Sequence, residues 1–200
     1  MTDNRKRECM VQTIVLGLLL LAAPRLTAAP LQLVVQGRPN AEVVLDLKEP
    51  QRQLQYAAQE LTNWLGRISG GVIPVVGSPG KGAVQIYLGT PRHSPAIAAF
   101  AKECPGDFKR LEWSDGFIIR RRDDSIYLAA VKTKGVLNSV YRFLERNTDI
   151  IFAREFEAED GCGTIYGHHP TIVNTVEDLV DVPVFPDHRF WTGNTEGNVA

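Results

Sequence analysis

Apolar residues recur at helical spacing in two stretches of the chain. The first stripe consists of Leu54, Ala57, Ala58, Leu61, Leu65 and Ile68. It predicts a helix of about five turns that starts after Pro50 and stops at Gly70–Gly71. The second stripe consists of Val136, Leu137, Val140, Tyr141 and Leu144. It predicts another helix, which opens at Gly135.

Shorter β-branched or alternating runs predict strands around these helices. Segments 31–36 and 42–47 form an expected opening pair, and 72–76 and 83–89 flank the loop GSPGKG (77–82). Segments 115–121 and 125–131 predict a hairpin, 150–154 is apolar, and 169–182 holds one or two strands. A short helix is expected within 90–104, beginning near Ser94–Pro95. The pattern predicts an α+β fold: a mixed, largely antiparallel sheet with the two main helices packed on one face.

The first 29 residues have the features of a secretory signal peptide. Arg5, Lys6 and Arg7 precede the apolar run at 11–23, and small residues follow at 26–29. This run is shorter than the roughly 20 residues needed to cross a bilayer. A cleaved signal peptide is therefore expected, with an uncleaved N-terminal anchor as the alternative. The mature protein would be secreted or periplasmic, with no membrane association after cleavage.

The charge balance excludes a nucleic-acid partner. Without residues 1–29 the chain has 18 basic and 21 acidic residues, a net charge of −3, so it lacks a basic footprint for phosphates. The run Arg120–Arg122 is followed at once by Asp123 and Asp124, which is typical of a solvated strand end.

Two cysteines follow the signal segment, Cys104 and Cys162. In an exported chain they could form a disulfide, and two separate thiols are the alternative. Sequence alone does not show whether their Cβ atoms come within bonding distance.

No catalytic, metal-binding or cofactor-binding residues are predicted. The acidic group at 155–160 lies in a loop-like stretch with little apolar sequence to shield it, and His168–His169 lacks a partner at helical spacing. There is no Gly-x-Ser-x-Gly motif. The loop GSPGKG lacks the spacing of a phosphate-binding loop and precedes a strand instead of a helix.

Three motifs carry a family resemblance. AAQELTNWLGRISGGVIPVV (57–76), DGFIIRR (115–121) and KGVLNSVYRFLERNTDIIF (134–152) occur in this order. The series resembles the N-terminal accessory domain of family 67 α-glucuronidases and of secreted hydrolases like the family 20 β-hexosaminidases. Lys134 and Asp149 depart from the arginine and glycine usual in that pattern.

The resemblance implies an α+β accessory domain at 30–182 that is not itself catalytic. In such enzymes it packs in cis against a (β/α)8 barrel that carries the catalytic carboxylates, and residues 183–200 would be the linker to that barrel or its start. The family linker reads Pro-x-Phe-x-x-Arg, and its arginine contacts sugar hydroxyls in the hexosaminidase branch. Arg189 is the corresponding candidate for substrate binding, although this chain has one more residue between Phe185 and Arg189.

Two functional hypotheses follow. The first is a non-catalytic domain of a secreted glycoside hydrolase that degrades polysaccharide such as xylan, from a chain truncated before its barrel. The second is a free-standing module that binds carbohydrate through Trp64, Trp113 or Trp191, or that serves as a cell-surface interaction domain.

Overall fold

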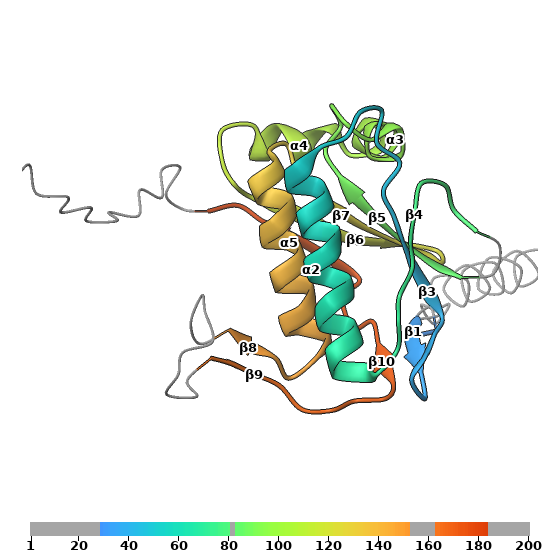
Figure 1. Ribbon diagram of the computed structural model, residues 1–200. Coiled ribbons are helices and arrows are strands. Elements are labelled where there is room, and N and C mark those ends of the chain that lie inside the picture. The colour runs from blue at the N-terminus through green and yellow to red at the C-terminus, as the bar shows by residue number, and fades with distance from the viewer. Residues whose placement is uncertain (1–28, 81–82, 153–162, 184–200) are drawn as a thin grey trace, which may run out of the picture.

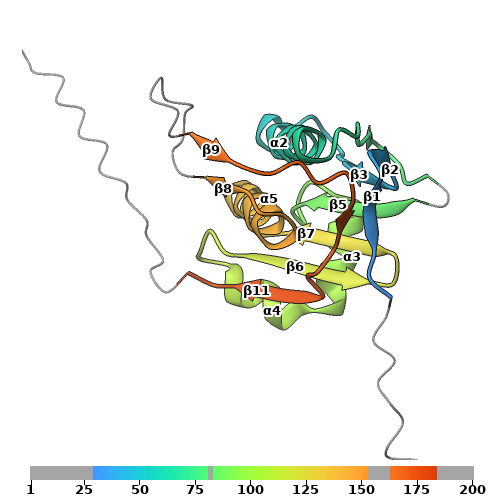
Figure 2. The ribbon, with the colours of Figure 1, turned by 90° about the horizontal axis from the view of Figure 1, so that it is seen from below.

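The computed structural model describes residues 29–80, 83–152 and 163–183. In this part of the chain a six-stranded sheet lies between two pairs of helices (Figures 1 and 2). Two long helices, α2 (Arg52–Ser69) and α5 (Thr133–Asn147), lie side by side on one face. The short helices α3 (Pro95–Glu103) and α4 (Pro105–Leu111) cover the other face. None of the described helices combines the length and apolarity needed to span a membrane.

The sheets confirm the predicted α+β class and its mixed, largely antiparallel pairing. The large sheet has the order β11 (Asp178–Asp181), β6 (Phe117–Arg122), β7 (Ser125–Ala129), β5 (Val84–Gly89), β3 (Ala41–Val44) and β4 (Val75–Val76). Its first three strands are antiparallel, and β7, β5, β3 and β4 are parallel. The two small sheets, which are antiparallel, are β10 (Ile172–Val173) with β1 (Gln32–Val35) and β2 (Arg38–Pro39), and β8 (Ile151–Phe152) with β9 (Thr164–Ile165).

The long helices form where the apolar stripes predict them. All six members of the first stripe are buried against the sheet. Gly70 ends α2 in the left-handed conformation, with φ 77°, and its N–H donates to the Gly66 carbonyl at 2.8 Å. Helix α5 begins at Thr133, two residues before the predicted start. Burial of one stripe per helix supplies most of the helical stability, because propensity alone is weak.

The opening strands do not form the expected pair. Gln36 and Gly37 both have positive φ, 50° and 73°, which turns β1 back onto β2 in a tight hairpin. The chain then continues into the large sheet as β3, whose four residues are all buried. The prediction placed both strands correctly along the chain and their partners incorrectly.

The arginine run was predicted to be a solvated strand end, which holds for the exposed Arg122 but is wrong for its two neighbours. Arg120 and Arg121 are buried, because β6 lies inside the sheet beside β11. Arg120 donates to Asp178 of β11 at 2.8 Å and pairs with Asp107 of α4 at 2.9 Å. Both carboxylates, together with their hydrogen bonds, raise the Arg120 pKa against the opposing effect of burial.

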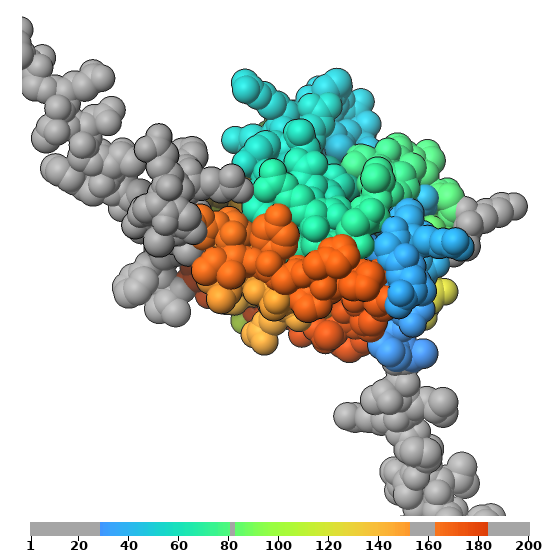
Figure 3. Space-filling view, turned by 60° about the horizontal axis from the view of Figure 1, so that its bottom comes forward, coloured from blue at the N-terminus to red at the C-terminus, as the bar shows by residue number. Residues whose placement is uncertain are grey.

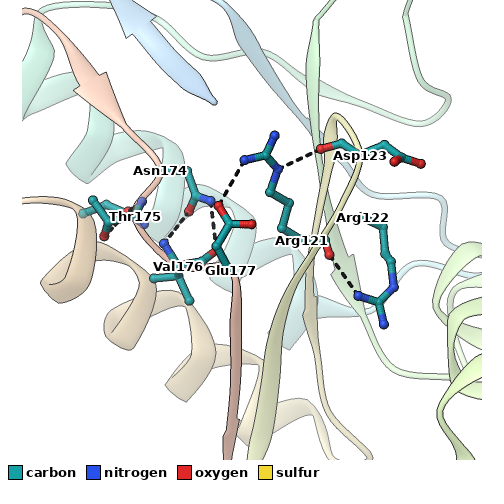
Figure 4. Close-up of polar contacts among 8 residues, drawn as sticks. Arg121, Arg122, Asp123, Asn174, Thr175, Val176 and Glu177 are labelled. Atoms are coloured by element: carbon teal, nitrogen blue, oxygen red, sulfur yellow. Dashed lines mark hydrogen bonds and ion pairs between the residues drawn. The ribbon is translucent and has the colours of Figure 1, made fainter. Parts of the chain in front are cut away.

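Arg121 uses its guanidinium to hold the corner that enters β11. It donates to Glu177 at 3.0 Å and to the Asp123 carbonyl at 2.9 Å (Figure 4). The buried Asn174 braces the same corner through a hydrogen bond of 2.9 Å to the Val176 carbonyl. These contacts satisfy a cation that would otherwise be costly to bury.

Helix α4 is missing from the sequence prediction, which expected a single short helix before residue 105. Ser94 caps α3 by accepting the Ile97 N–H at 3.1 Å, and Pro105 starts α4 directly after Cys104. Phe108 and Leu111 of α4 join Phe100 in a second, smaller core on this face. Seven residues are too few for a helical stripe to be recognised.

The segment 163–183 crosses the molecule as an extended strap. It passes the C-terminal end of α2, where the His169 N–H donates to the Ile68 carbonyl at 2.8 Å, and then reaches β1 (Figure 3). Its last strand, β11, runs in the same direction as β3, β5 and β7, since it is antiparallel to β6. The strap therefore ends at the edge where the parallel strands end.

Gly116 and Gly135 let two segments of backbone approach each other closely at that edge. A Cβ on Gly135 would lie 2.5 Å from the Gly116 carbonyl oxygen and 2.8 Å from the Cβ of Ala130. Both distances are too short for a side chain. Gly135 therefore allows the first turn of α5 to pack directly on the start of β6.

We expect the substitution Gly135→Ala to lower the free energy of unfolding by about 1–3 kcal/mol, because backbone must move to admit the methyl group. The matched control is Gly106→Ala in α4, where an added Cβ meets nothing within 4 Å. The control should be neutral or stabilising by up to about 1 kcal/mol. Urea unfolding measures both, and an equal effect at the two positions would contradict the packing argument.

Candidate interaction surface on the helix layer

Several residues considered from the sequence lie outside the described part of the chain. They are Arg189, His188, Trp191, Cys162 and the acidic group at 155–160. Cys104 carries a free thiol, which donates to the Phe100 carbonyl at 3.3 Å. Within residues 29–80, 83–152 and 163–183, no three His, Cys, Asp or Glu side chains gather closely enough to hold a metal ion.

The two adjacent histidines contribute to the strap. His168 and His169 are both exposed, and His169 Nε2 lies 3.0 Å from the Asp149 carboxylate. The Gly167 N–H also donates to Asp149, at 3.1 Å. These contacts lower the Asp149 pKa, with the Gly167 hydrogen bond as the largest cause. The cluster fastens the strap to the end of α5.

Ser94, His93 and Asp46 lie near each other at the start of α3. Their hydrogen bonds are not those of a catalytic nucleophile and its general base. Ser94 donates to Asp46, and the Ala96 N–H donates to the same carboxylate at 2.8 Å. His93 Nδ1 instead lies 2.8 Å from the Thr90 hydroxyl. Asp46 and Ser94 are therefore occupied by capping the helix.

Glu60 joins the two long helices. Its Oε2 accepts a hydrogen bond from Trp64 Nε1 at 3.1 Å, within α2, and another from the Tyr141 hydroxyl of α5 at 3.0 Å. Burial and then the neighbouring Glu60 carboxylate raise the Tyr141 pKa. The phenol therefore remains protonated and continues to donate at neutral pH.

An aromatic cluster surrounds this junction. The rings of Phe152 and Tyr166 each lie edge-on to Trp64, with centroids 5.6 Å apart. Arg67 places its guanidinium carbon 5.0 Å from the Trp64 ring centroid. Trp64 is thus already engaged by protein groups, whereas Trp113, in the turn before β6, is 78% exposed.

A groove runs between the outward sides of α2 and α5 above Glu60. Its hollow of about 500 Å³ is lined by Arg52, Gln53, Tyr56, Thr133, Lys134 and Leu137. Tyr56 is 48% exposed, and Thr133 donates to Gln53 across the groove. Arg52 and Lys134 stand at the end where both helices begin.

Farther along the two helices, the small sheet β8–β9 packs against Trp64 and Tyr141. Phe152 packs on Tyr141, with ring centroids 4.9 Å apart. On the same sheet Ile151 and Ile165 are each 58% exposed. We define the helix-layer surface as the groove together with this sheet: Tyr56, Trp64, Leu137, Tyr141, Ile151, Ile165 and Tyr166.

The helix-layer surface is suited to binding and not to proton transfer. Tyr56, Ile151, Ile165 and Tyr166 are exposed, whereas Trp64, Leu137 and Tyr141 are partly buried, and exposed apolar groups of this kind can mark interaction sites. Glu60, the carboxylate at the junction of the two helices, already accepts two hydrogen bonds. Glu60 and Tyr141 both belong to the motifs that carry the family resemblance, and this was the only signal in the sequence that could have singled them out.

Comparisons with known proteins assign no family. No family model matches the chain, and a search of curated proteins finds no match. Among solved structures, a mutant β-hexosaminidase of Streptomyces plicatus in complex with the product GlcNAc is 16% identical, with a TM-score of 0.39. The match covers 74% of this chain and 23% of that chain. A family 20 β-N-acetylhexosaminidase from Streptomyces coelicolor is 17% identical, with a TM-score of 0.39 and coverages of 74% and 24%.

The present chain spans less than a quarter of the length of these enzymes. Likeness at these TM-scores establishes neither a shared fold nor an activity. The contacts described above therefore carry the functional argument.

The substitution Tyr141→Phe tests the junction at Glu60. It removes one donor from a partly buried carboxylate, so the free energy of unfolding should fall by about 1–2 kcal/mol in urea. The control is Tyr166→Phe, on the exposed rim of the same cluster, which should change stability by less than about 0.5 kcal/mol. Equal losses for the two variants would show that the Glu60 hydrogen bond has no special weight.

Proposed function

We propose that this chain is a non-catalytic accessory domain of a secreted glycoside hydrolase. It packs in cis against a (β/α)8 catalytic barrel, in an enzyme of the α-glucuronidase or β-hexosaminidase type that degrades polysaccharide. The observation that carries the proposal is the helix-layer surface, where Tyr56 of α2 and Ile151, Ile165 and Tyr166 beside the two long helices expose apolar area. A domain that functions alone would gain nothing from leaving it uncovered.

The places of the motif residues support the same proposal. Ala57, Ala58 and Leu61 are buried in the main core. Gly135 admits the backbone of β6. The resemblance thus rests on residues that build the helix layer, as expected for a domain whose role is structural.

The course of the chain supports a connection at the end of β11. This strand ends at Asp181, beside Gly116, where an added Cβ would lie 2.5 Å from the Asp181 carbonyl and 3.0 Å from Pro183. In the proposal, residues 183–200 are the linker to the barrel or its start. Arg189 would then lie in this linker. Its contact with sugar hydroxyls, which the resemblance implies, is part of the same proposal.

Secretion is part of the proposal and is supported by the composition of residues 1–29. A basic start, an apolar run and small residues are the features that a signal peptidase recognises. An exported hydrolase would encounter polysaccharide outside the cytoplasm.

The second candidate function is a free-standing carbohydrate-binding module, and the exposed Trp113 is the observation that favours it. An open indole face is a stacking platform for a sugar ring. Trp64, the other tryptophan in the described part of the chain, is already engaged by Arg67, Phe152 and Tyr166.

We expect the purified 200-residue protein to release no nitrophenol from aryl glucuronides or aryl N-acetylglucosaminides. It should also give no binding heat with xylan, glucuronate-capped oligosaccharides or chitin fragments. Hydrolysis above the blank would overturn the non-catalytic role. Binding heat that disappears in Trp113→Ala and persists in Trp64→Ala would establish the carbohydrate-binding alternative instead.

The reading frame beyond codon 200 tests the partner in the proposal. A following βα-repeat with paired carboxylates is the expected result. A stop codon directly after codon 200 in the source genome would remove the barrel in cis.

A further inference from the structure

We infer that the groove of the helix-layer surface receives an α-helix of the partner domain, with an apolar stripe flanked by acidic side chains. The inference rests on the proposed function and deepens it by naming the chemistry of the partner. A barrel presents its outer helices to a neighbouring domain, and the groove has the shape and the charge to hold one of them.

The shape follows from the two helices. Both α2 and α5 begin at the same end and run side by side over the sheet (Figure 1). Helix α2 has 18 residues, a length of roughly 27 Å. Between them, Tyr56 and Leu137 line an apolar hollow of about 500 Å³. Side chains of a third helix can enter such a hollow as ridges enter a groove.

The charges of the groove are positive at its open end. Arg52 forms no ion pair within the described residues, and it lines the hollow together with Lys134. Lys134 forms an ion pair with Asp115, in which its Nζ lies 2.9 Å from the carboxylate. Farther down, Arg67 lies over Trp64. Glu60, which accepts hydrogen bonds from Trp64 and Tyr141, is not among the residues that line the hollow.

The helix ends add to this potential. Neither α2 nor α5 has an acidic residue in its first turn, and neither has a side-chain N-cap. The positive ends of both helix dipoles therefore lie beside Arg52 and Lys134. An acidic flank on the incoming helix complements both sources of positive charge, whereas a basic flank would be repelled.

The test uses two stapled helical peptides of about 15 residues, a length at which a free helix is only marginally stable. They share a leucine stripe and differ in having glutamate or lysine flanks. Nuclear magnetic resonance of the labelled 200-residue protein should show the acidic peptide shifting the amides of Tyr56, Leu137 and Tyr141. We expect it to bind about tenfold more tightly than the basic peptide, since each surface ion pair contributes up to about 1 kcal/mol.

Charge reversal provides the matched control. The double variant Arg52→Glu with Lys134→Glu should lose about tenfold in affinity for the acidic peptide and should favour the basic one. The variant Lys102→Glu with Lys109→Glu reverses two exposed lysines on α3 and α4, on the opposite face, and should bind as the parent protein does.

Equal binding of both peptides, binding of neither, or shifts confined to α3 and α4 would overturn the inference. These outcomes are separate from failure of the proposed function, because neither the sugar assays nor the reading frame beyond codon 200 depends on the peptides. If the groove selects the acidic peptide but the protein also binds sugars, the selectivity of the groove stands, and the proposed function together with its partner domain is overturned.

Discussion

The carboxylate of Glu60 is where the two long helices meet, and the helix-layer surface depends on it. Apolar burial brings α2 and α5 onto the sheet, but burial is non-directional and does not fix how the two helices face each other. The hydrogen bonds to Trp64 and Tyr141 do fix it. Tyr166 then packs on Trp64, and Phe152 packs on Tyr141. These ring contacts position the sheet β8–β9 against the helices.

Charged side chains of β6 position the strap in a similar way. Arg120 connects α4 and β11 through Asp107 and Asp178, and Arg121 holds the corner before β11. These ion pairs add little net stability, because taking a guanidinium out of water is costly. A wrong register, however, would leave a guanidinium buried and unpaired. These contacts therefore fix the register in which the strap joins the sheet, and they contribute little to the free energy of unfolding.

Sequence reasoning succeeded where structure is determined locally. The stripes of α2 and α5, the glycine stop at Gly70 and the hairpin of β6 and β7 are all readable over short windows. It failed where distant residues decide. Glu177 and Asp178, which pair with Arg121 and Arg120 at the start of β11, lie 56 and 58 positions away from them. The partners of β1 and β3 depend on a turn at Gln36–Gly37. In the same way Glu60 and Tyr141 stood in separate motifs, and nothing in their spacing of 81 residues showed that they touch.

The carboxylates that the described fold shields from water are committed to structural contacts. Glycosidic hydrolysis needs one carboxyl group that stays protonated and another that stays free to attack or to activate water. Each carboxylate that the described fold shields from water already has a partner: Glu42 with Gly80, Asp46 with Ser94, Glu60 with Tyr141, Asp107 with Arg120, Asp115 with Lys134 and Asp181 with Arg142. Freeing one of them for catalysis would open a cap, a helix contact or a strand junction. These six carboxylates therefore serve the fold: they hold helix caps, the contact between the long helices and the junctions of the strap with the sheet.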